Sequence, residues 1–152
     1  MLKRDFTINA LACPLPPGSR PLIDLCNGLN DIKRRRLRVV YGAAFDDDPL
    51  RIVRAYSMSA VYGLKIDEKT RRLIRRKKEL LKTIAGERLR EEFFKILCVP
   101  DALKTIRAMD RDGVLVHVIP QLRVMRRVKQ GGYHHLDVWG HSLEAFKKCE
   151  DL

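Results

Sequence analysis

Short apolar runs separated by turn signals occupy the first forty residues of the chain. Residues 6–12 predict a short helix that ends before Pro14, because proline disfavours a helical residue before it and lacks an amide donor. Residues 22–25 and 37–41 are apolar or alternating, which is typical of short strands. The Asn-Gly pair at 27–28 is a turn signal between them. This part is therefore predicted to mix one helix with short strands.

Helical spacing of apolar residues begins near Asp48. Asp48 can cap the free amides of a first helical turn, and Pro49 fits the first helical position. Leu50 and Val53 begin one apolar face, and Gly63 is expected to end this helix. Further helices are predicted over residues 67–83, 87–97, 100–109 and 138–149. The pattern as a whole predicts a mainly α protein, a helical bundle preceded by a small α+β segment.

Size and composition exclude some classes of protein. A length of 152 residues favours one domain or at most two small ones, and a content of 45% apolar residues is enough to form a core. No stretch reaches the ~18–20 apolar residues of a membrane helix, and residues 1–6 lack the apolar run of a signal peptide. Cys13, Cys26, Cys98 and Cys149 contain no CxxC pair. We therefore expect a cytoplasmic protein with reduced, mostly buried thiols.

The formal net charge of +12 is concentrated in three windows. Residues 65–90 hold eleven Lys or Arg against four Asp or Glu, residues 31–38 hold five against one, and residues 121–130 hold four against none. Clustered positive charge is the electrostatic footprint of a polyanion partner such as nucleic acid. The alternative is a solvated helical face, the commoner role of a single basic run.

Four stretches resemble one known family. Residues 3–12 (KRDFTINALA) resemble the RRDFTxNALA signature of the class II bacterial tRNA nucleotidyltransferases, or CCA-adding enzymes, and poly(A) polymerases. Residues 22–32 resemble the IDxxxGxxDL segment of that family, and residues 46–55 its EDPLRxxRA segment. Residues 87–92 resemble the helix that closes the family's neck. The order and spacing of these motifs make the resemblance specific.

The resemblance divides the chain into three parts. Residues 1–42 correspond to the C-terminal part of a nucleotidyltransferase, or palm, head. Residues 43–130 correspond to a helical neck and RNA-binding domain. Residues 131–152 correspond to the truncated start of an HD-type or body domain, after a Gly-Gly pair at 131–132 that is a plausible hinge.

The chain departs from the family pattern at two points. The family's catalytic metal carboxylates follow a Gly-Gly-Ser-like loop upstream of the RRDFT segment, and this chain contains no such loop followed by an acidic pair. We therefore expect no catalytic residue in the chain. The resemblance implies that the catalytic carboxylates, and the Mg²⁺ of the complete enzyme, lie upstream of Met1. The second departure is Asp47, where the family usually has Glu.

A stretch near the end, residues 134–142, resembles the opening of the HD phosphohydrolase domain that some family members carry. His134, His135 and His141 could ligate a metal in a complete domain, but no His-Asp dipeptide follows them. A metal site needs several convergent ligands. No metal ligand is therefore predicted, and His141 becomes a candidate only if a complete HD domain follows.

Asp48 and Arg51 are the residues that the resemblance assigns to base selection. They are three positions apart and so share one face of a helix. A carboxylate accepts from the exocyclic amine of adenine or cytosine, and a guanidinium donates to the ring nitrogen; guanine and uracil present the reverse pattern. Alternatively, Asp48 is only a helix cap and Arg51 a surface arginine.

The remaining nucleotide contacts come from the first motif. Arg4, Asp5 and Asn9 resemble the family's contacts to ribose and triphosphate, since an arginine can bind phosphate bidentately and the other two can bond a ribose hydroxyl. Alternatively, Asp5 only caps a helix. Arg54 completes the nucleotide-binding set and is expected to brace the neck.

The second motif supplies a hinge between head and neck. Asp24, Gly28 and Asp31 resemble this hinge, in which Gly28 provides backbone freedom. The alternative is a simple turn between strands, which predicts nearly the same local structure.

The resemblance implies part of a template-independent RNA nucleotidyltransferase that adds CCA or poly(A) to RNA 3′ ends. ATP and CTP are the expected substrates, and tRNA or another RNA 3′ end and the missing parts of the same protein are the expected partners. Phosphate contacts are predicted for basic residues on successive turns of one helix: Arg71, Arg72, Arg75, Arg76, Lys77 and Lys78. The alternatives are a stand-alone basic RNA-binding module without a nucleotide pocket, and a piece of an HD-type metal phosphohydrolase.

Overall fold

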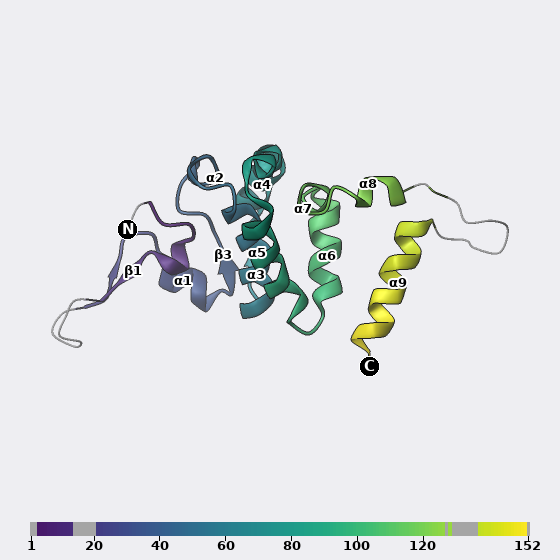
Figure 1. The fold of residues 1–152 in the computed structure, drawn as a ribbon. Coiled ribbons are helices and arrows are strands. Elements are labelled where there is room, and N and C mark those ends of the chain that lie inside the picture. The colour runs from purple at the N-terminus through teal and green to yellow at the C-terminus, as the bar shows by residue number, and fades with distance from the viewer. Residues whose placement is uncertain (1–2, 14–20, 127, 129–136, 152) are drawn as a thin grey trace.

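The computed structural model describes residues 3–13, 21–126, 128 and 137–151, and within them the chain is mainly helical, as predicted. Figure 1 shows β1 and α1 at one end of the molecule, α3 and α5 in the middle, and α6 and α9 at the other end. The elements in chain order are η1 (Thr7–Asn9), β1 (Leu11–Ala12), β2 (Ile23–Asp24), α1 (Gly28–Lys33), β3 (Arg36–Leu37), α2 (Ala44–Asp47), α3 (Arg51–Tyr62), β4 (Lys65–Ile66), α4 (Glu68–Lys77), η2 (Lys78–Thr83), α5 (Gly86–Leu97), α6 (Ala102–Arg111), α7 (Leu115–Val118), α8 (Leu122–Met125) and α9 (Val138–Glu150).

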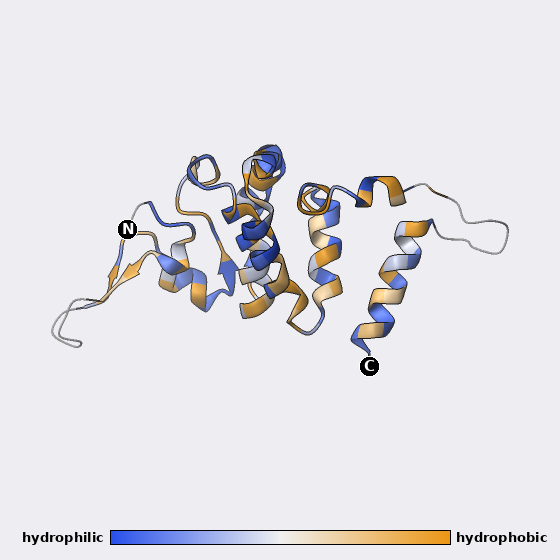
Figure 2. Ribbon diagram, in the orientation of Figure 1, coloured by the Kyte–Doolittle hydropathy of each residue, from blue (hydrophilic) through white to orange (hydrophobic). Residues whose placement is uncertain are grey.

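The core forms where α3 packs against α5 and α6. Ile52, Val53 and Tyr56 on α3 are almost completely buried, as are Ile96 on α5 and Met109 on α6. Apolar residues three and four apart on each helix create this contact, and hydrophilic residues cover the opposite faces (Figure 2). The central helices therefore form a rigid support for the residues at the start of α3.

Two short pairings connect the N-terminal segment to this core. β3 pairs in parallel with β4, and Phe6 forms an isolated bridge with Val39. Thr7 N donates to Arg38 O at 2.9 Å, and the Phe6 side chain is completely buried in the core. The predicted strand over 37–41 is correspondingly shorter, since β3 ends at Leu37.

Two local predictions for this segment are wrong. The helix expected over 6–12 is only the 3-10 turn η1, and the chain then enters β1, which pairs antiparallel with β2. The Asn-Gly pair is not a turn between strands, because Gly28 begins α1. In the first place a strand partner distant in sequence overrides a weak local preference. In the second, the Asp24 carboxylate accepts from the amides of Gly28 and Leu29 and so supports the first turn of α1.

The helix predicted from Asp48 begins three residues later. α2 ends at Asp47 and α3 begins at Arg51, because the residue before a proline avoids the helical region and Asp48 has an extended backbone. Asp48 still supports the start of α3: its Oδ1 accepts from Leu50 N at 3.3 Å, and its carbonyl accepts from Arg51 N at 3.1 Å. Asp48 and Arg51 therefore lie at a turn between two helices.

The later helices lie close to their predicted positions. Asp67, where the helix over 67–83 was predicted to start, caps α4 and accepts from Lys69 N at 3.0 Å; Gly63 ends α3 as expected, with φ 61°. The single helix predicted over 67–83 is instead α4 followed by the 3-10 helix η2.

The prediction of mostly buried thiols is wrong. None of the four cysteines forms a disulfide with another; Cys13, Cys98 and Cys149 are exposed, and Cys26 is half-buried. Trp139 is partly buried and packs at the edge of the core. Within the described part of the chain, no helix is long and apolar enough to span a membrane.

Candidate functional site

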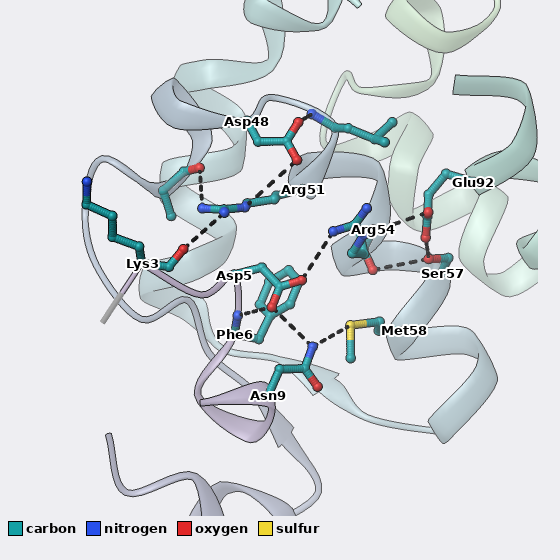
Figure 3. Close-up of polar contacts among 12 residues, drawn as sticks. Lys3, Asp5, Phe6, Asn9, Asp48, Arg51, Arg54, Ser57, Met58 and Glu92 are labelled. Carbon is teal, nitrogen blue, oxygen red and sulfur yellow. Dashed lines mark hydrogen bonds and ion pairs between the residues drawn. The ribbon is translucent and has the colours of Figure 1, made fainter. Parts of the chain in front are cut away.

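The turn between α2 and α3 brings together the two residues predicted to select the base (Figure 3). Asp48 Oδ2 lies 4.0 Å from Arg51 Nε. Three oxygens accept hydrogen bonds from the Arg51 guanidinium: the Tyr41 hydroxyl at 3.1 Å, the Ala44 carbonyl at 3.2 Å and the Lys3 carbonyl at 3.1 Å. Arg51 Nε is buried and has no hydrogen-bond partner among the described residues. The site thus presents a carboxylate acceptor beside an unmatched guanidinium donor.

Asp48 is also linked to the helix predicted to close the neck. Arg88 on α5 lies with Nη2 3.5 Å from Asp48 Oδ1. The neighbouring acidic residues are occupied elsewhere, because Tyr41 donates to Asp47 at 2.5 Å and Lys77 donates to Asp46 at 2.7 Å. The three consecutive aspartates therefore have different direct partners, and Asp47 is connected to Arg51 through the Tyr41 hydroxyl.

A second polar cluster lies between the N-terminal segment and α3 (Figure 3). Asp5 is buried, and its Oδ1 accepts from Asn9 Nδ2 at 3.1 Å, while its Oδ2 accepts from Arg54 Nη1 at 3.4 Å. Arg54 Nε lies 3.8 Å from Glu92 Oε2, and Glu92 also accepts from Ser57. Arg54 therefore joins a carboxylate of the N-terminal segment to one of α5.

Of the residues predicted to contact nucleotide, Arg4 is the one that stands apart. Its side chain is exposed and makes no hydrogen bond or ion pair with the described residues. Asp5, Asn9, Arg54 and Glu92 form one connected set, and Asp48 and Arg51 form another, both at the N-terminal half of α3. Glu92 was not predicted from the sequence, because it is one of several charged residues, basic and acidic, in the same helix.

The predicted hinge residues form a compact set of hydrogen bonds. Asp24 accepts from Gly28 N at 2.7 Å and Leu29 N at 3.0 Å, and these backbone bonds hold the pKa of its carboxyl below the ordinary value. Asp31 is completely buried and accepts from Thr7, Arg36 and Arg38 at 2.7–2.9 Å. Burial opposes ionisation of Asp31, but these three donors outweigh it and lower its pKa.

Gly28 has a different role from the one predicted. A side chain there would place Cβ 2.2 Å from the Thr7 carbonyl oxygen, so η1 and α1 approach each other too closely for any residue but glycine. Gly28 does not need the backbone freedom of glycine, since it is not among the described glycines with positive φ, which are Gly63 and Gly113. Gly28 therefore acts through close packing.

The predicted RNA-binding helix divides into two groups of cations. Arg71 and Arg75 donate to Asp112 at 2.8 and 2.7 Å, and Tyr56 donates to the same buried carboxylate at 2.7 Å. Burial opposes ionisation of Asp112, but these donors outweigh it and lower its pKa. Lys78 Nζ reaches the Asp112 carbonyl at 3.4 Å, and Lys77 is paired as described above.

Arg72 and Arg76 form the other group. Both are exposed and make no hydrogen bond or ion pair with the described residues. Asp112 itself was missed by sequence reasoning, because its Asp-Gly context indicates only a turn.

Metal ligation finds no support in the described residues. Within residues 3–13, 21–126, 128 and 137–151, no group of three or more His, Cys, Asp or Glu could hold a metal ion. His141 lies on α9, whereas His134, His135 and the proposed hinge at 131–132 lie outside the described residues. Among the described residues, then, no such group offers a place for Mg²⁺.

Two families match the sequence. The family described as "Poly A polymerase head domain" matches residues 1–38, and the one described as "Probable RNA and SrmB-binding site of polymerase A" matches residues 63–125. The chain is 38% identical to the A-adding tRNA nucleotidyltransferase of Deinococcus radiodurans, covering 94% of this chain and 33% of that protein. It is 44% identical to the CC-adding tRNA nucleotidyltransferase of Geobacter sulfurreducens, covering 73% of this chain and 25% of that protein.

Solved structures are similar over the same part of the chain. A Thermotoga maritima CCA-adding enzyme complexed with tRNA superposes with a TM-score of 0.73 and 37% identity, covering 86% of this chain and 31% of that one. A CCA-adding enzyme complexed with CTP gives 0.73 and 40%, covering 78% and 29%, and one with ATP gives 0.71 and 37%, covering 86% and 31%. The chain thus spans about a third of the length of the proteins it matches.

Proposed function

The chain belongs to the class II tRNA nucleotidyltransferase and poly(A) polymerase family, and from that premise we propose that it selects the incoming nucleotide and binds RNA for a template-independent RNA nucleotidyltransferase. The complete enzyme would add CCA, or its A or CC part, or poly(A) to an RNA 3′ end. Solved relatives complexed with tRNA, ATP and CTP support tRNA as the partner and ATP and CTP as the substrates.

The observation that carries the proposal is the acceptor and donor pair at the start of α3. Asp48 Oδ2 can accept from the exocyclic amine of adenine or cytosine, and Arg51 can donate to the adjacent ring nitrogen. Guanine and uracil present a carbonyl and a ring N–H to this pair, so both contacts become unfavourable. The buried, unmatched Arg51 Nε is the donor that a base would satisfy. Because this atom is covered in the free chain, we expect nucleotide binding to move the Arg51 side chain.

The second polar cluster would position the sugar and phosphates. Asp5 is held by Arg54 and Asn9, and the Asn9 side-chain oxygen makes no hydrogen bond with the described residues, so it can accept from a ribose hydroxyl. Arg4 is exposed and can meet the triphosphate bidentately. No metal-dependent step is assigned to the described residues, because no group of three or more His, Cys, Asp or Glu among them could hold a metal ion.

RNA binding is proposed for the solvent-facing cations of α4. Arg72 and Arg76 are available for phosphates, whereas Arg71 and Arg75 are bound to Asp112. Contacts between these cations and RNA phosphates would not depend on the RNA sequence and would weaken as the salt concentration rises.

Titration of ATP, CTP, GTP and UTP into the chain tests base selection. We expect ATP and CTP to bind more tightly than GTP and UTP. Arg51→Ala should remove most of this preference, because a lost bidentate pair costs about 1–3 kcal/mol of discrimination in base-edge recognition.

Arg51→Lys is the matched control for charge. We expect no rescue, because an ammonium lacks the planar fork of a guanidinium. If the wild-type chain binds all four nucleotides equally while binding RNA in a salt-dependent way, a stand-alone RNA-binding module explains it better. If Arg51→Ala keeps full selectivity and only its melting temperature falls, Asp48 and Arg51 are structural.

A further inference from the structure

Tyr41 contacts both of the helices that flank the predicted base-selecting pair. It is half-buried and lies between β3 and α2. Its hydroxyl donates to Asp47 Oδ2 at 2.5 Å, at the end of α2, and accepts from Arg51 Nη1 at 3.1 Å, at the start of α3. One side chain therefore joins the two sides of the turn that carries Asp48.

The chemistry of the three groups fixes the direction of these hydrogen bonds. A carboxylate can only accept and a guanidinium can only donate, whereas a tyrosine hydroxyl has one hydrogen to give and lone pairs that accept. The hydroxyl must therefore give its hydrogen to Asp47, which leaves its lone pairs for Arg51. Because the acceptor is charged, the bond to Asp47 is of the short, strong kind.

Asp47 acts on Arg51 through this hydroxyl. Among the described residues, the ion pair of Arg51 is with Asp48, at 4.0 Å, and none joins Arg51 to Asp47. Asp47 is the position at which the chain departs from the family motif, and the proposed function gives it no role. In the structure its carboxylate orients the Tyr41 hydroxyl, and that hydroxyl holds the guanidinium.

Tyr41 differs from the other groups that accept from Arg51 in the described structure. Those groups are the carbonyls of Ala44 and Lys3, which belong to the backbone. The guanidinium must turn to present its buried Nε to a base. A side chain can turn with it, whereas a carbonyl of packed backbone cannot, so Tyr41 is the partner that can stay bonded to Arg51 during the change.

We propose that Tyr41 is a positioning residue that determines specificity, because it sets the orientation of Arg51 beside Asp48. The inference rests on the proposed function, since it assumes that Arg51 recognises the base. A guanidinium offers several donors, so one that rotates freely could also meet the carbonyl of guanine or uracil. Holding it in one orientation therefore increases the preference for adenine and cytosine, without any contact between Tyr41 and the nucleotide.

Tyr41→Phe removes the hydroxyl and keeps the ring, and titration of the full chain with ATP, CTP, GTP and UTP measures the effect. We expect the affinities for ATP and CTP to fall about 3- to 10-fold, the scale of one hydrogen bond, and those for GTP and UTP to change little. General damage to the fold would weaken all four together. Tyr62→Phe is the matched control, since Tyr62 is 60% exposed and lies at the far end of α3.

Asp47→Asn tests the connection behind Tyr41. An uncharged amide holds the hydroxyl less firmly, so selectivity should fall in the same direction as in Tyr41→Phe. The double variant Y41F/D47N should lose no more than Y41F alone, because both changes act through one hydroxyl. Asp46→Asn removes the same charge from the neighbouring residue, whose partner is Lys77, and should keep full selectivity.

NMR of the free chain follows the orientation of Arg51 without any nucleotide. The Nε–Hε signal of Arg51 can be identified by its absence in Arg51→Lys. We expect this signal to shift or broaden in Tyr41→Phe and to stay unchanged in Tyr62→Phe.

Several results would overturn the inference. Wild-type selectivity in Tyr41→Phe would do so and leave base selection by Arg51 intact, as would an unchanged Arg51 signal. Equal weakening of all four nucleotides would make Tyr41 merely structural, and additive losses in the double variant would mean that Asp47 and Tyr41 act separately. If the wild-type chain binds all four nucleotides equally, base selection itself is contradicted and the inference fails with it.

Discussion

Gly28 begins α1 where the backbone of η1 passes so close that no side chain fits. A Cβ at this position would lie 2.2 Å from Thr7 O, 2.9 Å from the Thr7 carbonyl carbon and 3.2 Å from Leu11 Cδ2. The same junction holds Asp31, whose buried carboxylate binds the Thr7 hydroxyl. One small residue therefore determines how closely the predicted hinge is packed.

Gly28→Ala should lower the free energy of unfolding by about 1–3 kcal/mol, because overpacking against backbone cannot be relieved by a rotamer change. Gly86→Ala is the matched control, since nothing lies within 4 Å of a Cβ there and the residue begins α5. We expect this control to be neutral or to stabilise by about 0.4–1 kcal/mol. Urea unfolding measures both, and equal effects of the two variants would contradict the close-packing explanation.

At the scale of an element, α4 has two functions on two faces. One face is fixed to the core through Asp112, which gathers Arg71 and Arg75 from 41 and 37 residues away in sequence. The other face carries Arg72 and Arg76 in solvent. A single basic run thus contains both structural and free charges.

Two double variants separate these faces, and each removes two arginines. R72Q/R76Q should reduce the salt slope of RNA binding by about 1.4–1.8 and leave the melting temperature unchanged. R71Q/R75Q should lower the free energy of unfolding by about 3 kcal/mol, because it leaves the buried Asp112 carboxylate unpaired, and should change the salt slope little. Salt titrations of RNA binding and thermal melts give both quantities. Indistinguishable behaviour of the two variants would mean that the faces are not separate.

At the scale of the whole molecule, three buried groups give stability the same dependence on pH. Burial lowers the pKa of His117 below 6.5, although Glu79 at 3.4 Å opposes this and Lys78, Lys82 and Arg123 add to it. The pKa values of Asp31 and Asp112 lie below the ordinary 3.8, because their hydrogen-bond donors outweigh burial. For each group the unfolded chain binds protons more readily, so stability falls as the pH falls.

The melting temperature should therefore be constant near neutral pH and fall in two stages. The first stage begins at about pH 6.5, as unfolded histidine gains its proton, and the second below about pH 4, as the carboxylates do. His117→Leu should remove the first stage and keep the second. Melting curves between pH 8 and 3 would contradict this account if the wild-type midpoint did not change between pH 7 and 5.

The sequence by itself determined the features that depend on neighbouring residues. The helix start at Asp67, the helix end at Gly63 and the apolar periods of the central helices use local signals, and these predictions are confirmed. The family resemblance was also available from local motifs, and it placed Asp48 and Arg51 together. Their distance in the structure follows from their separation of three residues.

Only the tertiary structure determined what depends on residues far apart in the chain. η1 gives way to β1 because β2 supplies a partner. Asp112 selects which arginines of α4 are structural, and α9 is held against α6 by bonds between residues far apart in the chain. Burial and long-range pairing decide these features, and no local sequence pattern indicates which distant residue will contact a given position.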